Sequence, residues 1–186
     1  MACNHWHIGL PRGLWGTAIH TFIVVALSEE LCKFWFLKRY YPHSAFNEPY
    51  DGITYAVMVS MGFATVENLL YVLGSENPIE IGMVRMFTAV PAHATFGVMM
   101  GFFFGMAKFR PRYAFWFKLA GISIAVLFHG SYDFFLYVGA KNGTWLGAVA
   151  SLFLGLWLSL RAIKIYTGKS VFVLEGIMPE EDEPEK

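Results

Sequence analysis

Apolar residues fall into five long runs along the chain, and the loops between them carry proline, glycine and charge. A transmembrane helix needs roughly 20 consecutive, mostly apolar residues, and every run reaches about that length. The pattern therefore predicts five membrane-spanning helices. Their approximate ranges are 14–37, 52–73, 81–107, 115–138 and 144–163. Asp51 directly precedes the second run, where its side chain can cap the first helical turn.

Composition supports a membrane fold. Hydrophobic residues make up 56% of the 186 residues, more than a soluble domain of this length can bury. We predict an all-α, polytopic membrane helix bundle over residues 1–167. The formal net charge is zero, which gives no indication of a nucleic-acid partner. Two cysteines in the whole chain argue against a disulfide framework.

Lysine and arginine are distributed unevenly among the loops. The loops after the first and third runs and the end of the fifth run are rich in these residues, and the opposite loops have few. Short loops with Lys and Arg stay in the cytoplasm, so we expect the N-terminus outside and the C-terminus in the cytoplasm. Residues 168–186 are acidic and contain prolines, as is typical of a disordered tail.

The first predicted span contains Glu29, Glu30 and Lys33, although charged side chains are costly at membrane depth. Lys33 follows the two glutamates by four and three residues, so either carboxylate can reach it on one helix face. A single acid and base would neutralise each other as a structural pair. Here two acids face one base, and one carboxylate is left over.

The second and third spans add further polar groups. Glu67 and Asn68 lie well inside the second span, where an asparagine alone could simply bond to a neighbouring helix. Arg85 and His93 lie in the third span. His93 comes one turn before three glycines at positions 97, 101 and 105, whose GxxxG spacing lets another helix approach closely. We therefore expect His93 to face a neighbouring helix. Pro91 predicts a helix kink just before it.

The fourth span contains His129 and Asp133, four residues apart and hence on one face. A carboxylate in this position can fix the tautomer of the imidazole. The pair could also be a private hydrogen bond that allows both groups to be buried.

Taken together, four of the five spans contribute ionisable residues. Four acids against two bases give a formal charge of minus two with neutral histidines, and uncompensated charge is costly in a low dielectric. This balance predicts one convergent, water-accessible polar site rather than scattered structural pairs. Its candidate members are Glu29, Glu30, Lys33, Glu67, Arg85, His93, His129 and Asp133.

Four ordered stretches resemble motifs of the PrsW intramembrane proteases. They are SEELCKFW, FNEPYDGITYAVMVSMGFATVENLLY, RMFTAVPAHATFGVMMGFFFGMAKF and LFHGSYDFF, and they span roughly residues 26–137. A more distant resemblance is to the CAAX prenyl endopeptidases and the scaffold subunit of gamma-secretase. The resemblance implies a peptidase in a bacterial or archaeal cell membrane that cuts a membrane-anchored protein, such as an anti-sigma factor.

The resemblance also implies roles for individual residues. Glu29 and Glu30 match the paired glutamates of the family, with Lys33 as their basic partner. The later motifs are matched by Glu67 with Asn68, by His93, and by His129 with Asp133. Family members usually have further spans before the glutamate pair, whereas 28 residues precede Glu29 here. We therefore expect either a more open site or a wall supplied by a second protomer in a homo-oligomer.

Peptide hydrolysis needs an activated water, a group that stabilises the oxyanion and an acid for the leaving amine. By analogy with the CAAX enzymes, we expect Glu29 and His93 to activate water. Lys33 would hold Glu30, and His129 would steady the oxyanion with help from Asp133 and Asn68. The competing mechanism is a catalytic zinc on Glu67, His93 and His129. Of the two, we favour the metal-independent mechanism.

Two functions other than proteolysis are compatible with buried acids. One is a catalytically silent scaffold that holds a partner, which the intact glutamate pair disfavours. The other is a proton- or cation-coupled carrier. Carriers often contain internal repeats, and the chain offers only a short similarity between ENLLYVLG and DFFLYVG. A proteolysis assay on membrane-anchored candidates separates the three functions.

Overall fold

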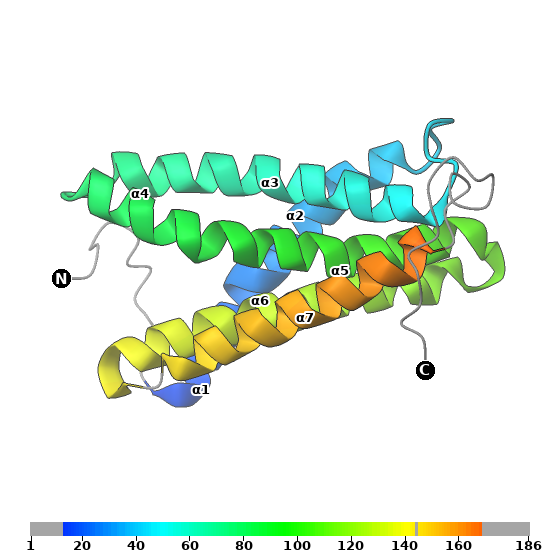
Figure 1. Cartoon of the computed structure of the whole chain (residues 1–186). Coiled ribbons are helices and arrows are strands. Elements are labelled where there is room, and N and C mark those ends of the chain that lie inside the picture. Colours follow the sequence, from blue (N-terminus) through cyan, green and yellow to red (C-terminus); the bar gives the residue numbers. More distant parts are fainter. Residues whose placement is uncertain (1–12, 144, 169–186) are drawn as a thin grey trace, which may run out of the picture.

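The computed structural model describes residues 13–143 and 145–168, and every regular element in these ranges is helical (Figure 1). The prediction of an all-α bundle is confirmed. The longer elements are α1 (Leu14–Ile19), the π-helical η2 (His20–Ala26), α2 (Leu27–Leu37), α3 (Pro49–Leu73), α4 (Pro78–Phe87), α5 (Ala89–Phe109), α6 (Ala114–Asn142) and α7 (Leu146–Thr167). Two single 3₁₀ turns, Lys38–Tyr40 and Pro111–Tyr113, complete the order.

Four helical stretches are long and apolar enough to cross a membrane, and they correspond to the second to fifth predicted spans. They are Pro49–Leu73, Pro78–Phe109, Pro111–Gly139 and Leu146–Thr167. The first predicted span is also helical from Leu14 to Leu37, through α1, η2 and α2, but it is not one of these four stretches.

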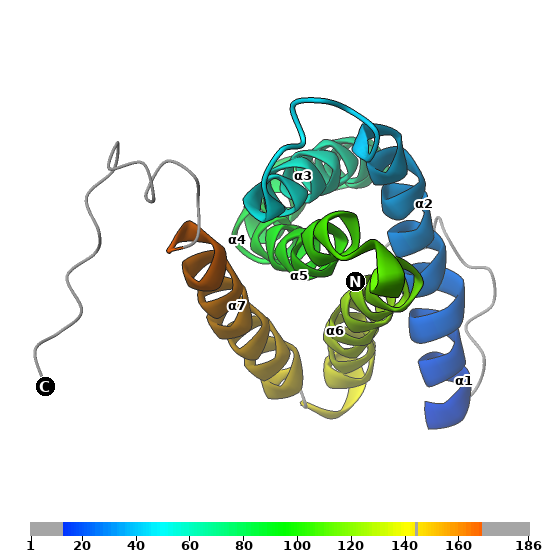
Figure 2. The same ribbon diagram turned by 90° about the vertical axis from the view of Figure 1, so that its right-hand side faces the viewer.

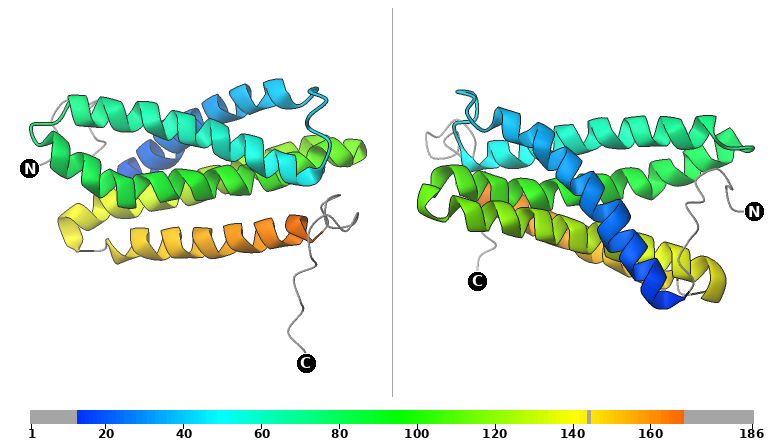
Figure 3. Two further views of the ribbon diagram at one scale, coloured as in Figure 1. Left: turned by 45° about the horizontal axis from the view of Figure 1, so that its top comes forward. Right: turned by 180° about the vertical axis from the view of Figure 1, so that it is seen from behind.

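Helix α5 lies at the centre of the bundle. It packs against α3, α6 and α7, which surround it in the end-on view of Figure 2. The segment α1–η2–α2 runs obliquely across the other helices and contacts both α3 and α6 (Figure 3). Aromatic side chains fill the core near the end of α5, where Phe46, Phe104 and Leu37 are almost completely buried.

The glycines of α5 bring it into backbone contact with α3. A side chain at Gly101 would meet Gly52 and Ile53 of α3, and a Cβ at Gly97 would lie 2.9 Å from that of Ser60. The close approach expected from the GxxxG spacing is thus present. This close approach matters for the site, because it determines which polar residues of α3 and α5 lie opposite each other.

The third predicted span consists of two helices rather than one kinked helix. Helix α4 ends at Phe87 and α5 begins at Ala89, so the break lies at Thr88, upstream of Pro91. A proline clashes with the carbonyl four residues earlier and cannot donate to it. That carbonyl belongs to Phe87, which accounts for the position of the break. The predicted kink directly before His93 is therefore misplaced by about one turn.

Asp51 supports the start of α3 from a different position than predicted. Helix α3 begins at Pro49, and Asp51 is its third residue instead of its cap. Its carboxylate accepts hydrogen bonds from the backbone N–H groups of Asn47 and Glu48, both at 2.9 Å. The side chain still satisfies donors that the helix start leaves free.

The loops rich in Lys and Arg lie at one end of the bundle. The α2–α3 and α5–α6 connections and the end of α7 share that end, and the start of α1 lies at the other (Figure 1). This arrangement agrees with the charge asymmetry used above, while the orientation in a membrane stays a prediction. The predicted acidic tail lies, apart from Gly168, outside the described residues.

Candidate active site

The structure brings together all eight ionisable residues that the sequence singled out. They come from five helices: Glu29, Glu30 and Lys33 from α2, Glu67 from α3, Arg85 from α4, His93 from α5, and His129 and Asp133 from α6. We call this group the polar cluster. Each member lies within 4.0 Å of another member.

Glu30 is the most deeply buried carboxylate of the polar cluster. Its side chain has no exposed surface, and its Oε1 atom accepts hydrogen bonds from Lys33 Nζ at 2.6 Å and from His129 Nδ1 at 2.8 Å. These hydrogen bonds satisfy Oε1, whereas the Oε2 atom of Glu30 is buried without a hydrogen-bond partner. The spacing allowed Lys33 to reach either glutamate, and its shorter contact is with Glu30, the partner expected by analogy with the CAAX enzymes.

His93 joins Lys33 to Glu67. Its Nδ1 atom lies 2.9 Å from Lys33 Nζ, and its Nε2 atom lies 2.7 Å from Glu67 Oε2. An ammonium group can only donate, so Nδ1 accepts and the ring proton is assigned to Nε2, which donates it to Glu67. Ser60 of α3 also donates to the backbone carbonyl oxygen of His93 at 2.6 Å, which ties this turn of α5 to α3.

Arg85 supports Glu67 from the far side. Its Nη2 atom lies 2.9 Å from Glu67 Oε2, and its Nε donates to Asn68 Oδ1 at 2.7 Å. The guanidinium group also lies over the ring of Tyr71, 3.9 Å from its centroid. Asn68 therefore orients Arg85 and, through it, Glu67. The expectation that Asn68 assists His129 does not match this geometry, because helix α3 directs the amide towards α4.

His129 lies among three carboxylates. Besides the bond from Nδ1 to Glu30, its Nε2 atom lies 3.4 Å from Asp133 Oδ2 and 3.8 Å from Glu29 Oε2. The ring stacks on Phe96 with centroids 4.9 Å apart, which holds its plane. The predicted spacing of His129 and Asp133 on one face of α6 thus gives a direct contact.

Glu29 is held less tightly than its neighbour. Its Oε2 atom is buried, lies 3.8–3.9 Å from His129 Nε2 and Lys33 Nζ, and has no hydrogen-bond partner. Glu29, Glu67 and His93 each place one ligand atom within 4.8 Å of the others. A carboxylate oxygen without a partner beside a second carboxylate and an imidazole is a donor set that suits a divalent cation.

A divalent cation also fits the charge of the polar cluster. Its four carboxylates and two cationic side chains have a formal charge of minus two when the histidines are neutral. A buried site can carry such a charge only if protons or a bound cation compensate it. The ligand group differs from the one expected from sequence, because Glu29 replaces His129. A cation bound through His93 Nε2 would take the place of the proton that Nε2 shares with Glu67.

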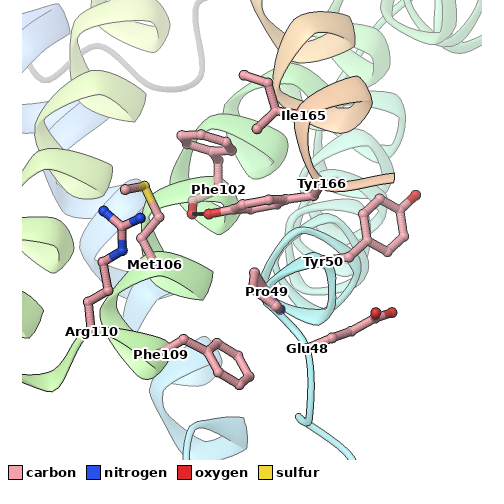
Figure 4. A pocket seen from close by; sticks show the side chains of 9 residues that line it. All are labelled: Glu48, Pro49, Tyr50, Phe102, Met106, Phe109, Arg110, Ile165 and Tyr166. Carbon is pink, nitrogen blue, oxygen red and sulfur yellow. Dashed lines mark hydrogen bonds between the residues drawn. The ribbon is translucent and has the colours of Figure 1, made fainter. Parts of the chain in front are cut away.

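Two pockets lie among the described residues, and only one of them touches the polar cluster. A pocket of about 200 Å³ lies between the start of α3 and the ends of α5 and α7, where Arg110, Phe102 and Tyr166 line it (Figure 4). It contains no residue of the polar cluster. A second pocket of about 400 Å³ between α2 and α3 includes Lys33 and therefore borders the cluster.

A family model described as PrsW family intramembrane metalloprotease matches residues 3–160. This chain belongs to the PrsW family. It is 41% identical over 153 residues to Protease PrsW of Geobacillus kaustophilus, and 38% identical over 146 residues to Protease PrsW of Bacillus subtilis. These matches cover 79% and 76% of this chain, and it spans only 64% of the length of each of these two relatives.

Another PrsW relative is covered more fully. Protease PrsW of Halalkalibacterium halodurans is 32% identical over 162 residues, which is 86% of this chain and 74% of that protein. No solved structure matches the chain. The description of the PrsW family as metalloproteases weighs against the metal-independent mechanism that the sequence analysis favoured.

Sequence reasoning missed several parts of this PrsW site. Phe96 and Phe63 form aromatic walls beside His129 and His93, and Glu29 takes the place expected for a second histidine. The spacing of Phe96 three residues after His93, on the same face, is a signal that could have identified it. His20 contacts the ring of Tyr137 and is not part of the polar cluster.

Lys33 should be needed for stability because its loss leaves Glu30 without its cationic partner. Removing one partner of a buried ion pair costs about 3–5 kcal/mol, so Lys33→Met should lower the free energy of unfolding by that amount. The double variant Lys33→Met/Glu30→Gln should recover much of the loss. Denaturant titration in detergent micelles measures all three proteins.

The matched control for this cycle is Lys38→Met, which removes an exposed lysine from the end of the same segment. Its effect should stay within about 0.5 kcal/mol. If Lys33→Met and Lys38→Met lower the free energy of unfolding equally, Lys33 does not hold the polar cluster together.

Proposed function

We propose that this chain is an intramembrane endopeptidase that hydrolyses a membrane-anchored protein, with an anti-sigma factor as the substrate class that the family resemblance suggests. The observation that carries the proposal is the convergence of Glu29, Glu67 and His93 within 4.8 Å, inside a bundle of membrane-length helices. Ionisable residues at such depth are rare and usually functional. The similar proteins named above are themselves called proteases.

A divalent metal held by Glu29, Glu67 and His93 would supply an activated water and polarise the scissile carbonyl. Lys33 orients His93 and Glu30 at the same time, since its ammonium group bonds to both. The Arg85 guanidinium fixes the position of Glu67. These contacts keep two of the three ligand groups, Glu67 and His93, in place before substrate binds, as a preorganised site requires.

His129 is the residue proposed to steady the oxyanion and to serve the leaving amine. Both ring nitrogens have carboxylate neighbours, Glu30 at Nδ1 and Asp133 at Nε2, so a proton on either nitrogen has a nearby acceptor. Stacking on Phe96 keeps the ring from rotating. A positioned imidazole of this kind can donate a proton in the transition state.

Catalysis should depend on Glu29 and His93. Glu29→Gln and His93→Ala should each lower the cleavage rate by at least about a hundredfold, because each removes a group that holds or moves a proton or ligand at the reacting centre. Cleavage of membrane-anchored candidates by protein reconstituted in vesicles measures this. Glu76→Gln and His43→Ala, at exposed loop positions, should cleave at the rate of the original protein.

The scaffold and carrier functions are tested by the same assay. A scaffold or carrier would not cleave any membrane-anchored candidate, and full activity of both Glu29→Gln and His93→Ala would show that the catalytic assignment is wrong.

Cleavage should require a bound metal, and metal binding should depend on Glu29 but not on Glu30. Elemental analysis should find about one divalent ion per chain, lost in Glu29→Gln and Glu67→Gln, because these carboxylates belong to the ligand group. Glu30→Gln is the matched control, since Glu30 lies outside the ligand group and its Oε1 atom is bound to Lys33 and His129. The folded fraction of this variant, isolated by gel filtration, should retain the ion. Chelation should abolish cleavage, and zinc should restore it. Activity after exhaustive chelation would instead favour a metal-independent reaction on Glu29 and His93.

The cut should fall on the outer side of the membrane. With the N-terminus outside, α3 runs outward, and Glu67 lies six residues before its last residue, about 9 Å at 1.5 Å per residue. Half of a hydrocarbon core is about 15 Å, so the polar cluster would lie in the outer half. Mass spectrometry of the new termini of a cleaved substrate locates the cut. Termini on the cytoplasmic side would show that the proposed orientation is inverted.

A further inference from the structure

The apolar pocket between α2 and α3 lies directly beside the polar cluster. Its volume of about 400 Å³ falls within the range of pockets that bind small ligands. One lysine and six apolar or aromatic residues line it: Lys33, Phe36, Tyr40, Val59, Gly62, Phe63 and Val66.

Lys33 belongs both to the lining of this pocket and to the polar cluster. Lys33 Nζ bonds to Glu30 and His93, and it lies 4.7 Å from the ring centroid of Phe63. The Phe63 ring is in turn 6.0 Å from that of His93. A group seated in the pocket therefore touches residues that orient the proposed reacting centre.

Part of the pocket lining lies on the outside of the bundle. Helix α2 runs obliquely to α3 (Figure 3), and Phe36, Tyr40 and Val66 are exposed, Val66 by 60%. A Cβ atom built on Gly62 would meet nothing within 4 Å, so this glycine leaves space that a larger residue would fill. In a membrane, such an apolar opening faces lipid.

We propose that this pocket binds one apolar side chain of the substrate's membrane segment, next to the bond that is cut, and thereby selects substrates by the size of that side chain. The proposal rests on the peptidase function proposed above. A whole helix is about 10–12 Å across, too wide for this volume, so one side chain of a locally unwound segment is the occupant that fits.

The position of the pocket favours a peptide residue over a lipid chain. Lys33 Nζ is buried, bonds to Glu30 and His93 and lies 3.9 Å from Glu29 Oε2, so the pocket borders the carboxylates and the imidazole of the polar cluster. A substrate side chain seated beside Phe63 would bring its own backbone next to the proposed reacting centre, whereas an acyl chain carries no bond for that centre to cut.

Filling the pocket at Gly62 should change which substrates are cut. The test uses membrane-anchored reporters that differ only at the residues flanking the mapped cut, which are Gly, Val, Leu or Phe. Gly62→Leu should lower kcat/KM at least tenfold for the Leu and Phe reporters and leave the Gly and Val reporters within about twofold, because the added side chain takes the space of a large residue.

Thr65→Leu is the matched control, since Thr65 is an exposed residue three positions further along α3 that does not line the pocket. It should leave the preference unchanged. If Gly62→Leu cleaves all reporters with the original preference, the pocket proposal is overturned while the peptidase function stands.

Cross-linking decides the proposal even if no reporter is cut. A photoreactive benzoylphenylalanine replaces Val66 or, as control, Thr65 in the Glu29→Gln protein, which is reconstituted in phosphatidylcholine vesicles with a synthetic apolar peptide of about 20 residues. Capture of the peptide from position 66 and not from position 65 supports the pocket. Equal capture from both positions, or capture of lipid alone, overturns it.

Discussion

The buried ammonium group of Lys33 holds the polar interior of this bundle together. Its Nζ atom lies 2.6 Å from Glu30 and 2.9 Å from His93, so one side chain of α2 connects that helix with α5 and, through Glu30 and His129, with α6. Charges in a low dielectric must be paired and hydrogen-bonded, or their burial costs more than packing can offset. The arrangement of α2 against the other helices is therefore fixed by polar contacts as much as by apolar ones.

Close packing elsewhere makes these polar contacts possible. Glycines on one face of α5 let α3 approach to backbone distance, and this approach places Glu67 2.7 Å from His93 Nε2. The bond from Ser60 to the carbonyl of His93 lies at the same interface. Small residues thus determine where the large polar ones meet, as in many helix pairs within membranes.

The charges that hold the polar cluster together also leave it with groups that can bind a metal or transfer a proton. Two cations cannot neutralise four carboxylates, and Glu29 and Glu30 each retain one buried oxygen without a hydrogen-bond partner. An excess of carboxylate suits metal binding and proton transfer better than it suits stability alone. Under the proposed function, the apolar pocket beside Lys33 would connect this polar interior with the lipid, from which a membrane-anchored substrate would arrive.

The sequence by itself determined the helical membrane fold and the residues of the polar cluster, because apolar run length and spacings of three or four residues are local properties. The pairs Glu30–Lys33 and His129–Asp133 follow from such spacings. Only the tertiary structure decided that Glu29, and not His129, joins Glu67 and His93. Contacts between helices depend on crossing angle, height and rotation, and η2 changes the rotation of α2 because a π-helix has more residues per turn than an α-helix.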